Sequence, residues 1–303
     1  MSSIEAANLF NVNGLVAVVT GGGSGRSPAM QNPSCNYDEP LLTFLNAGIG
    51  FMIAKALALN GAHKVYIIGR RKENLETAAK ESPYNNIVPI QGDVTSKESL
   101  SSIVAHIQQE IGYINVLIAN SGIGGPQEGS SATRPDLSLE EFQSKLWSTS
   151  FEDYTQTFAV NASSVFFSIV AFLGLLHAGN EKGNVVQKSQ VIVTSSIGGY
   201  NRNVPGGYAY GQSKAAATHL VKQMATNLVP YEIRANALAP GRTITFHFSS
   251  SQDPLPRSGP FVFLYSAAMA DQIRSLSIGH VSRNYRRCNY LFSRQDTSWQ
   301  SRV

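Results

Sequence analysis

Cysteine is scarce in this sequence: only Cys35 and Cys288 occur in 303 residues. Two cysteines provide neither a disulfide framework nor a multi-cysteine metal site. The six histidines show no pair at the spacing that puts two ligands on one face of a helix, so we predict no metal site. This cysteine usage suits a reducing compartment, and we expect a cytoplasmic protein.

A secretory leader and a long apolar run are also missing. The first ten residues, MSSIEAANLF, contain an acidic residue and no basic stretch ahead of an apolar run. The longest nearly apolar run, VFFSIVAFLGLL from Val165 to Leu176, is too short to span a bilayer and is typical of a buried helix. We therefore expect no membrane attachment.

Charge is sparse and unevenly placed. Charged residues make up 15% of the chain, and the formal net charge is +4. The segment from Arg242 to Val303 holds eight arginines and three aspartates, so the positive charge lies there and the rest of the chain is close to neutral. A basic tail on a neutral body gives no reason to expect a nucleic-acid partner.

Strand-like and helix-like segments alternate through the first 241 residues. The expected strands are continuous apolar runs, each of a length that suits a parallel strand covered on both faces. Repeated strand-helix units imply right-handed crossovers, and the sequence predicts an α/β fold with a Rossmann-type, doubly wound parallel sheet. The six expected strands are Val16–Thr20, Lys64–Gly69, Ile87–Gly92, Val116–Asn120, Gln190–Ser196 and Ile233–Ala239.

This alternation stops after Pro240 and Gly241. We predict one domain over residues 1–241, followed by a divergent, poorly structured tail over 242–303. No further strand-helix repeat is recognisable in the tail, so we expect the seventh strand of such a sheet to be lost.

The first expected strand runs into TGGGSG, Thr20 to Gly25. Glycines at the end of a strand let the backbone approach a pyrophosphate, and the helix that follows offers its N–H groups. Here the helix comes only after an interruption, because removing Arg26–Gly48 joins Gly25 to Ile49 and restores TGGGSGIG. The repair suggests a retained intron translated in frame, and the alternative is a true loop insertion.

Several further motifs follow in a fixed order. They are GIG after the interruption, GDV at Gly92–Val94, ANSG at Ala119–Gly122, VNAS around Asn161, TSSIGG at Thr194–Gly199, YGQSK at Tyr210–Lys214 and APG at Ala239–Gly241. Together with the glycine turn these motifs resemble the short-chain dehydrogenase/reductase family, in the type found in fungal secondary metabolism, and also 3-oxoacyl-carrier-protein reductases of rhamnolipid synthesis. The resemblance covers Leu15 to Gly241 apart from the interruption.

Tyr210 and Lys214 stand four residues apart, which places both side chains on one face of a helix. A cation beside a phenol stabilises the phenolate, so the tyrosine can exchange a proton with a carbonyl or alcohol oxygen near neutral pH. The resemblance implies that Tyr210 is the catalytic acid or base and that Lys214 also holds the nicotinamide ribose. Tyr208 has no lysine four residues on.

Ser196 ends the fifth expected strand, where a hydroxyl can stabilise charge on a substrate oxygen. Ser195 is the alternative, and a turn-forming serine is the structural interpretation. Asn161 matches the helix asparagine of the family, which implies that it anchors a water relay to Lys214. An asparagine inside a helix otherwise needs a structural reason.

The cofactor can be predicted from charge. The second expected strand ends in Gly69-Arg70-Arg71, with no carboxylate to accept ribose hydroxyls, so NADP(H) is favoured over NAD(H). The arginines could instead be the solvated start of a helix. The resemblance implies cofactor contacts from Gly21, Gly25, Ile49, Gly50, Arg70, Asp93, Asn120, Tyr210 and Lys214, with Gly122 in the same cleft.

The sequence thus predicts an NADPH-dependent reductase that interconverts a ketone and a secondary alcohol, in the synthesis of polyketide-like secondary metabolites. The expected partner is a small carbonyl or alcohol substrate. Members of the family tend to form homo-oligomers, although the divergent tail would remove part of the usual contact surface. The alternatives are a catalytically impaired member or aberrant gene product without turnover, and a sensor that only binds NADPH.

Overall fold

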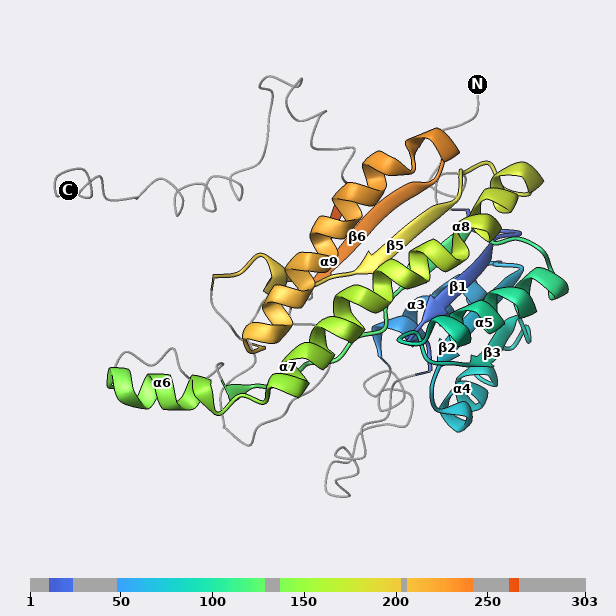
Figure 1. Cartoon of the computed structure of the whole chain (residues 1–303). Helices are drawn as coiled ribbons and strands as arrows, with labels where there is room; N and C mark the ends of the chain where they lie inside the picture. Colours follow the sequence, from blue (N-terminus) through green and yellow to red (C-terminus); the bar gives the residue numbers. More distant parts are fainter. Residues whose placement is uncertain (1–10, 24–47, 129–136, 203–205, 242–261, 267–303) are drawn as a thin grey trace, which may run out of the picture. The chain divides into compact units, whose positions relative to one another are not determined.

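The structure is a computed structural model, and it describes residues 11–23, 48–128, 137–202, 206–241 and 262–266. Figure 1 shows strands and helices alternating along the chain, with helices packed on both faces of one sheet. The predicted α/β, Rossmann-type fold is confirmed. Most of the predicted insertion and tail lie outside the described residues.

The sheet has the strand order β3-β2-β1-β4-β5-β6-β7. The first six of these strands pair in parallel, and each ends within about two residues of the predicted bounds. The order changes direction between β1 and β4, so the carboxyl ends of these two strands flank the crevice where such sheets bind ligands. The bounds are β1 Val16–Thr20, β2 Lys64–Gly69, β3 Ile87–Gln91, β4 Val116–Ala119, β5 Gln190–Thr194 and β6 Arg234–Pro240.

The expectation that the seventh strand is lost needs correction. Residues Val262–Ser266 form β7, which pairs antiparallel with β6 from Pro240↔Val262 to Asn236↔Ser266. An antiparallel neighbour needs no crossover helix, so the run VFLYS can complete the sheet without another strand-helix repeat. The prediction failed because it looked for that repeat.

Three helices cover one face of the sheet: α5 (Lys97–Glu110), α8 (Ser164–Lys182) and α9 (Tyr208–Asn227). Their apolar sides share a core with every second residue of the strands, because successive strand residues point to opposite faces. Members of this core include Val18, Ile68, Leu117, Val193, Leu100, Ile107, Phe172, Leu176 and Val221.

Two helices cover the other face, beside β1 and β2: α3 (Ile49–Leu59) and α4 (Lys72–Ala79). Small residues on α3 bring it close to the strands. The core on this face includes Val19, Ile67, Ile118, Phe51, Ala54, Ala58 and Leu75. Because both faces are packed, β1 and β4 are buried along their length and β2 is buried from Val65 to Ile68, as the apolar sequences of these runs predict.

Between β4 and β5 the chain forms α6 (Leu139–Trp147), α7 (Phe151–Phe158), the π-helical turn η3 (Ala159–Ser163) and α8. The stretch Phe151–Lys182 is long and apolar enough, by length and composition, to cross a membrane. Core helices of water-soluble proteins meet the same criterion. Here Ile169, Phe172 and Leu176 are buried against the sheet, which is the position of a core helix.

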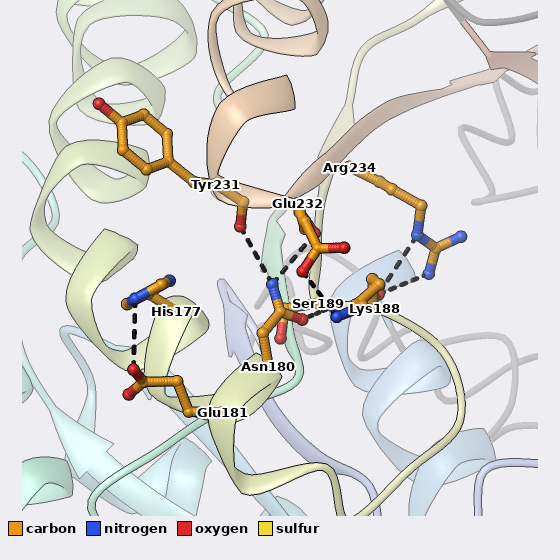
Figure 2. A network of polar contacts seen from close by, with 8 residues as sticks. All are labelled: His177, Asn180, Glu181, Lys188, Ser189, Tyr231, Glu232 and Arg234. Atoms are coloured by element: carbon orange, nitrogen blue, oxygen red, sulfur yellow. Dashed lines mark hydrogen bonds and ion pairs between the residues drawn. The ribbon is translucent and has the colours of Figure 1, made fainter.

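A polar network fixes the amino ends of β5 and β6 (Figure 2). Asn180, near the end of α8, donates to the carbonyls of Tyr231 and Glu232 and accepts from the backbone N–H of Ser189. Arg234 donates to the Lys188 carbonyl, and the Lys188 ammonium pairs with Glu232 at 2.7 Å. This network lies at the end of the sheet where β5 and β6 begin, opposite the carboxyl ends of the strands and away from the predicted site.

Candidate active site

The two halves of the glycine turn meet at the carboxyl end of β1. Gly21 follows β1 with a φ of 69°, and Gly50 lies in the first turn of α3. A Cβ atom at Gly50 would stand 2.7 Å from the carbonyl oxygen of Gly21, closer than a side chain can approach. The helix therefore begins, at Ile49, directly over the end of β1, although residues 24–47 separate the two in sequence. Gly25 lies outside the described residues.

Asn120, just after β4, holds this junction together. Its Nδ2 donates to the Thr20 carbonyl at 3.1 Å, and its backbone N–H donates to Thr20 Oγ1 at 3.0 Å. The N–H of Ser121 donates to the same hydroxyl. Thr20 is buried and was not among the predicted site residues. Its position as the last residue of an apolar strand, directly before the first glycine, was the only signal.

The amino end of α3 carries no side-chain cap and no acidic residue in its first turn. By contrast Ser96, Ser138 and Ser150 cap α5, α6 and α7. The N–H groups at a helix start and the positive end of its dipole favour an anion. The turn formed by Gly21, Ile49 and Gly50 therefore fits a phosphate group, and its contact with a cofactor stays a prediction.

Arg70 and Asp93 follow β2 and β3 at the same edge. Asp93 accepts hydrogen bonds from the hydroxyl and the N–H of Thr95, at 2.7 and 2.9 Å. The hydrogen bond from the Thr95 hydroxyl contributes most to lowering the pKa of Asp93. The bond from the Thr95 N–H and the nearby positive charge of Arg70 lower it further. Arg71 is the N-cap residue of α4, so for this arginine the helix-start interpretation also holds. Arg70 is exposed and its guanidinium is available for a ligand.

Tyr210 and Lys214 lie on the first turns of α9, on one face. The Lys214 Nζ is 5.9 Å from the centre of the Tyr210 ring and donates to the Thr194 carbonyl at 2.8 Å. Lys214 is only 5% exposed, and burial lowers its pKa to about 8. No carboxylate pairs with it among the described residues, so its charge is directed at the phenol and the crevice.

The two adjacent serines after β5 have different roles. The Ser195 hydroxyl is 2.6 Å from the Thr218 hydroxyl and donates to the Lys214 carbonyl. Both partners belong to α9, so this hydroxyl is buried against that helix. The Ser196 Oγ accepts from the N–H of Gly198 and leaves its own hydrogen for another partner. A Cβ at Gly198 would lie 3.3 Å from both Ser196 Oγ and the Tyr210 ring. Ser196 is therefore the serine that faces Tyr210.

Asn161 lies inside η3, where the helix widens by one residue, and is fully buried. Its Oδ1 accepts from the Ile123 N–H at 2.8 Å, and its Nδ2 donates to the Ile123 carbonyl at 2.9 Å and to Ser213 Oγ at 3.0 Å. Ser213, between Tyr210 and Lys214, was missed because the sequence marks it only as a spacer. The side chain of Asn161 thus has a structural duty, the second of the two interpretations left open by the sequence.

Gly122 lies against the side chains of both Asn161 and Lys214. A Cβ at Gly122 would stand 3.1 Å from Asn161 Oδ1 and 3.2 Å from Lys214 Nζ. The loop after β4 therefore passes directly over the lysine and the asparagine, and any side chain there would push on both. The structure places Asn161, Ser196, Tyr210 and Lys214 at one carboxyl edge, beside the junction of Gly21, Gly50 and Asn120.

A doubly wound parallel sheet with a phosphate turn after its first strand, and a Ser, Tyr and Lys set at the same edge, defines a nicotinamide-dependent oxidoreductase. A family profile described as short chain dehydrogenase matches residues 41–255. The chain belongs to the short-chain dehydrogenase family.

Individual relatives agree with this assignment. The chain is 52% identical over 240 residues to the short-chain dehydrogenase/reductase PhomF of Diaporthe leptostromiformis, covering 79% of this chain and 73% of the relative. It is 40% identical over 258 residues to VdtF of Byssochlamys spectabilis, covering 79% and 76%. The solved Pseudomonas aeruginosa RhlG/NADP active-site complex is similar in fold, with a TM-score of 0.60 and 26% identity over 78% of this chain and 75% of that chain.

Proposed function

We propose that this chain is an NADP(H)-dependent reductase that interconverts a ketone and a secondary alcohol in the synthesis of a polyketide-like secondary metabolite. The observation that carries the proposal is the placement of a buried ammonium, Lys214, beside the ring of Tyr210, with no carboxylate paired to it among the described residues and with Ser196 across Gly198. Such a group serves proton transfer rather than stability, since burying an unpaired charge is costly.

In this function the protein residues handle the substrate oxygen. Ser196 donates a hydrogen bond to the carbonyl oxygen, and Tyr210 gives that oxygen a proton as the alcohol forms. The Lys214 charge stabilises the phenolate that remains. Asn161 holds the loop after β4, and with it the wall of the crevice, through Ile123. A bound NADPH would supply the hydride that reduces the carbonyl carbon.

The residues at the sheet edge support NADP(H). The uncapped start of α3 suits the pyrophosphate, and Arg70, which has no acidic neighbour in the sequence Gly69-Arg70-Arg71, suits a 2′-phosphate. Asp93 would meet the adenine, and Asn120 would line the cleft. The similar RhlG structure contains NADP, which is consistent with this choice.

The alternative of an impaired or aberrant product is less favoured, because the two halves of the glycine turn lie together and the four predicted catalytic residues lie at the same end of the sheet.

The resemblance to fungal secondary-metabolism members supports the substrate class. A cytoplasmic location and a homo-oligomeric state belong to this proposal, and cell fractionation and light scattering would measure them.

The test is oxidation of NADPH, followed by absorbance, with a panel of aromatic and acyl ketones. We expect turnover with NADPH, turnover at least about tenfold weaker with NADH, and a loss of about 100-fold or more for Tyr210→Phe. Tyr208→Phe is the matched control and should keep its activity. NADPH binding without turnover on any ketone or alcohol would favour the sensor, and absence of binding would contradict the proposal.

A further inference from the structure

Two glycine-containing loops touch at the edge of the candidate site. The first, Gly122–Gln127, follows β4, and the second, Gly206-Gly207, leads into α9. Their backbones are in direct contact, because a Cβ at Gly207 would overlap the carbonyl oxygen of Pro126. Gly207 also has a φ of 80°, which a residue with a side chain rarely adopts.

The side chain of Gln127 joins the two loops. Its Nε2 donates to the Gly206 carbonyl at 3.1 Å and to the carbonyls of Gly124 and Gly125 in its own loop, at 3.3 and 3.1 Å. Gln127 is exposed, so burial of apolar surface does not explain its orientation. One amide therefore contacts three carbonyl oxygens, one of them on the neighbouring loop.

The second loop is in contact with the catalytic tyrosine. A Cβ at Gly206 would stand 2.8 Å from Cδ1 of Tyr210, so the Gly206 backbone lies against the phenol ring. The first loop is anchored at its other end by Asn161, which holds both backbone groups of Ile123. Contacts thus run without a break from Asn161 through Ile123 and Gln127 to the Gly206 backbone and the Tyr210 ring.

We propose that Gln127 is a positioning residue for the reductase reaction: its amide holds the Gly206 backbone against Tyr210 and so fixes the direction of the phenol hydroxyl. This inference rests on the proposed function. A displacement of about 1 Å in a reacting group can reduce the rate by about 100-fold, so a surface hydrogen bond that sets this geometry affects the rate. The phosphate turn at Gly21 and Gly50 is a separate structure, and cofactor binding should not depend on Gln127.

The experiment compares Gln127→Met and Gln127→Glu with the native chain. Methionine has a similar length but no N–H donor, and glutamate would turn a carboxylate toward carbonyl oxygens. We expect kcat to fall about tenfold for methionine and further for glutamate, with the KM for NADPH within about twofold of the native value. The control is Gln109→Met on the exposed side of α5, which should change neither constant.

Amide hydrogen exchange gives a readout that does not need turnover. In Gln127→Met, exchange should become faster in the segment 206–214 and stay unchanged in α5. Unchanged exchange, or faster exchange with an unchanged kcat, would overturn the positioning role. If the native chain shows no turnover at all, the proposed function fails, and the exchange rates alone then decide whether Gln127 holds the Gly206 segment.

Discussion

The burial of Lys214 lowers the free energy of unfolding and places an ammonium group beside Tyr210. The ammonium is buried, is paired with no carboxylate among the described residues and donates one hydrogen bond there, to the Thr194 carbonyl. The pKa falls from 10.5 to about 8 because burial disfavours the charged form. Below that pKa the folded chain must hold a desolvated charge, and the unfolded chain holds the same charge in water.

Replacing this lysine should stabilise the protein. At pH 7 we expect Lys214→Met to raise the free energy of unfolding by on the order of 2 kcal/mol, since a pKa unit corresponds to about 1.4 kcal/mol and the lost hydrogen bond offsets about 1 kcal/mol. The native chain gains stability as pH rises from about 8 to 10.5, because only the unfolded state then keeps the proton. The advantage of the variant should therefore shrink across that range.

Urea unfolding at neutral pH and at about pH 9.5 measures this difference. Lys80→Met, at an exposed position, is the matched control for the substitution itself. A difference between native and Lys214→Met that stays constant with pH would mean that the lysine is not destabilised by burial. The variant should also lose reductase activity.

Asn161 has the opposite effect on stability. Asn161→Ala would remove the partners of both part-buried backbone groups of Ile123. It would also remove one of the two hydrogen bonds of Ser213, whose hydroxyl still donates to the Tyr210 carbonyl. We expect the free energy of unfolding to fall by about 2 to 4 kcal/mol, because unsatisfied buried polar groups are costly. Asn201→Ala, at an exposed position near the site, should change it by less than about 0.5 kcal/mol. Equal urea midpoints for the two variants would contradict the assignment.

The sequence identified residues whose spacing carries information. Tyr210 and Lys214 could be paired because four residues make one helical turn. Ser196 was predicted with Ser195 as the alternative, and only the fold shows which of the two hydroxyls packs on α9. The link between Gln127 and Gly206 spans parts of the chain far apart, and no local pattern marks it.

At the scale of elements, two glycines in α8 make a matched pair. A Cβ at Gly179 would overlap the Ile114 carbonyl oxygen, a backbone atom that cannot move aside, whereas a Cβ at Gly174 would meet nothing within 4 Å. We expect Gly179→Ala to lower the free energy of unfolding by about 1–3 kcal/mol through overpacking. Gly174→Ala should raise it by about 0.5–1 kcal/mol, because alanine favours the helix.

Thermal or urea unfolding of the two single variants tests the pair, and the sign is the decisive result. Stabilisation by both substitutions would mean that α8 sits further from β4 than the hydrogen bond from the Ile114 N–H to the Leu175 carbonyl indicates. Such an outcome would also contradict the packing of α8 against the sheet that is described above.

The strands were easier to predict than the details of the helices. Strands buried on both faces are uniformly apolar, so their ends are marked by the first polar or glycine residue. The π-helical turn η3 was not predicted, because one extra residue in a helix leaves no trace in composition. β7 was missed because a short edge strand has no repeat unit around it.

At the scale of the whole molecule, the split glycine turn leads to a test. Gly21 and Gly50 already lie together, so residues 24–47 should not prevent NADPH binding. We expect the native chain and a chain lacking Arg26–Gly48 to bind NADPH with dissociation constants within about tenfold of each other. The shortened chain should be more stable by about 1–3 kcal/mol, since loop closure costs entropy that grows slowly with length.

Quenching or enhancement of NADPH fluorescence measures the binding. Binding by the shortened chain alone would mean that the inserted residues obstruct the turn, and that this chain is the defective product considered from the sequence. The sequence raised this question and could not answer it, because the distance between two segments of a turn is a property of the folded chain. The retained-intron hypothesis itself concerns residues outside the described part and stays a prediction.

The direction of β7 decides where the chain leaves the sheet. A parallel seventh strand would end at the carboxyl edge, next to Ser196 and Tyr210. Because β7 is antiparallel, its last residue, Ser266, lies beside Asn236, toward the edge that holds the polar network of Figure 2. The backbone of Ser266 therefore lies toward the end of the sheet away from Ser196 and Tyr210, so β7 ends where it does not obstruct a substrate.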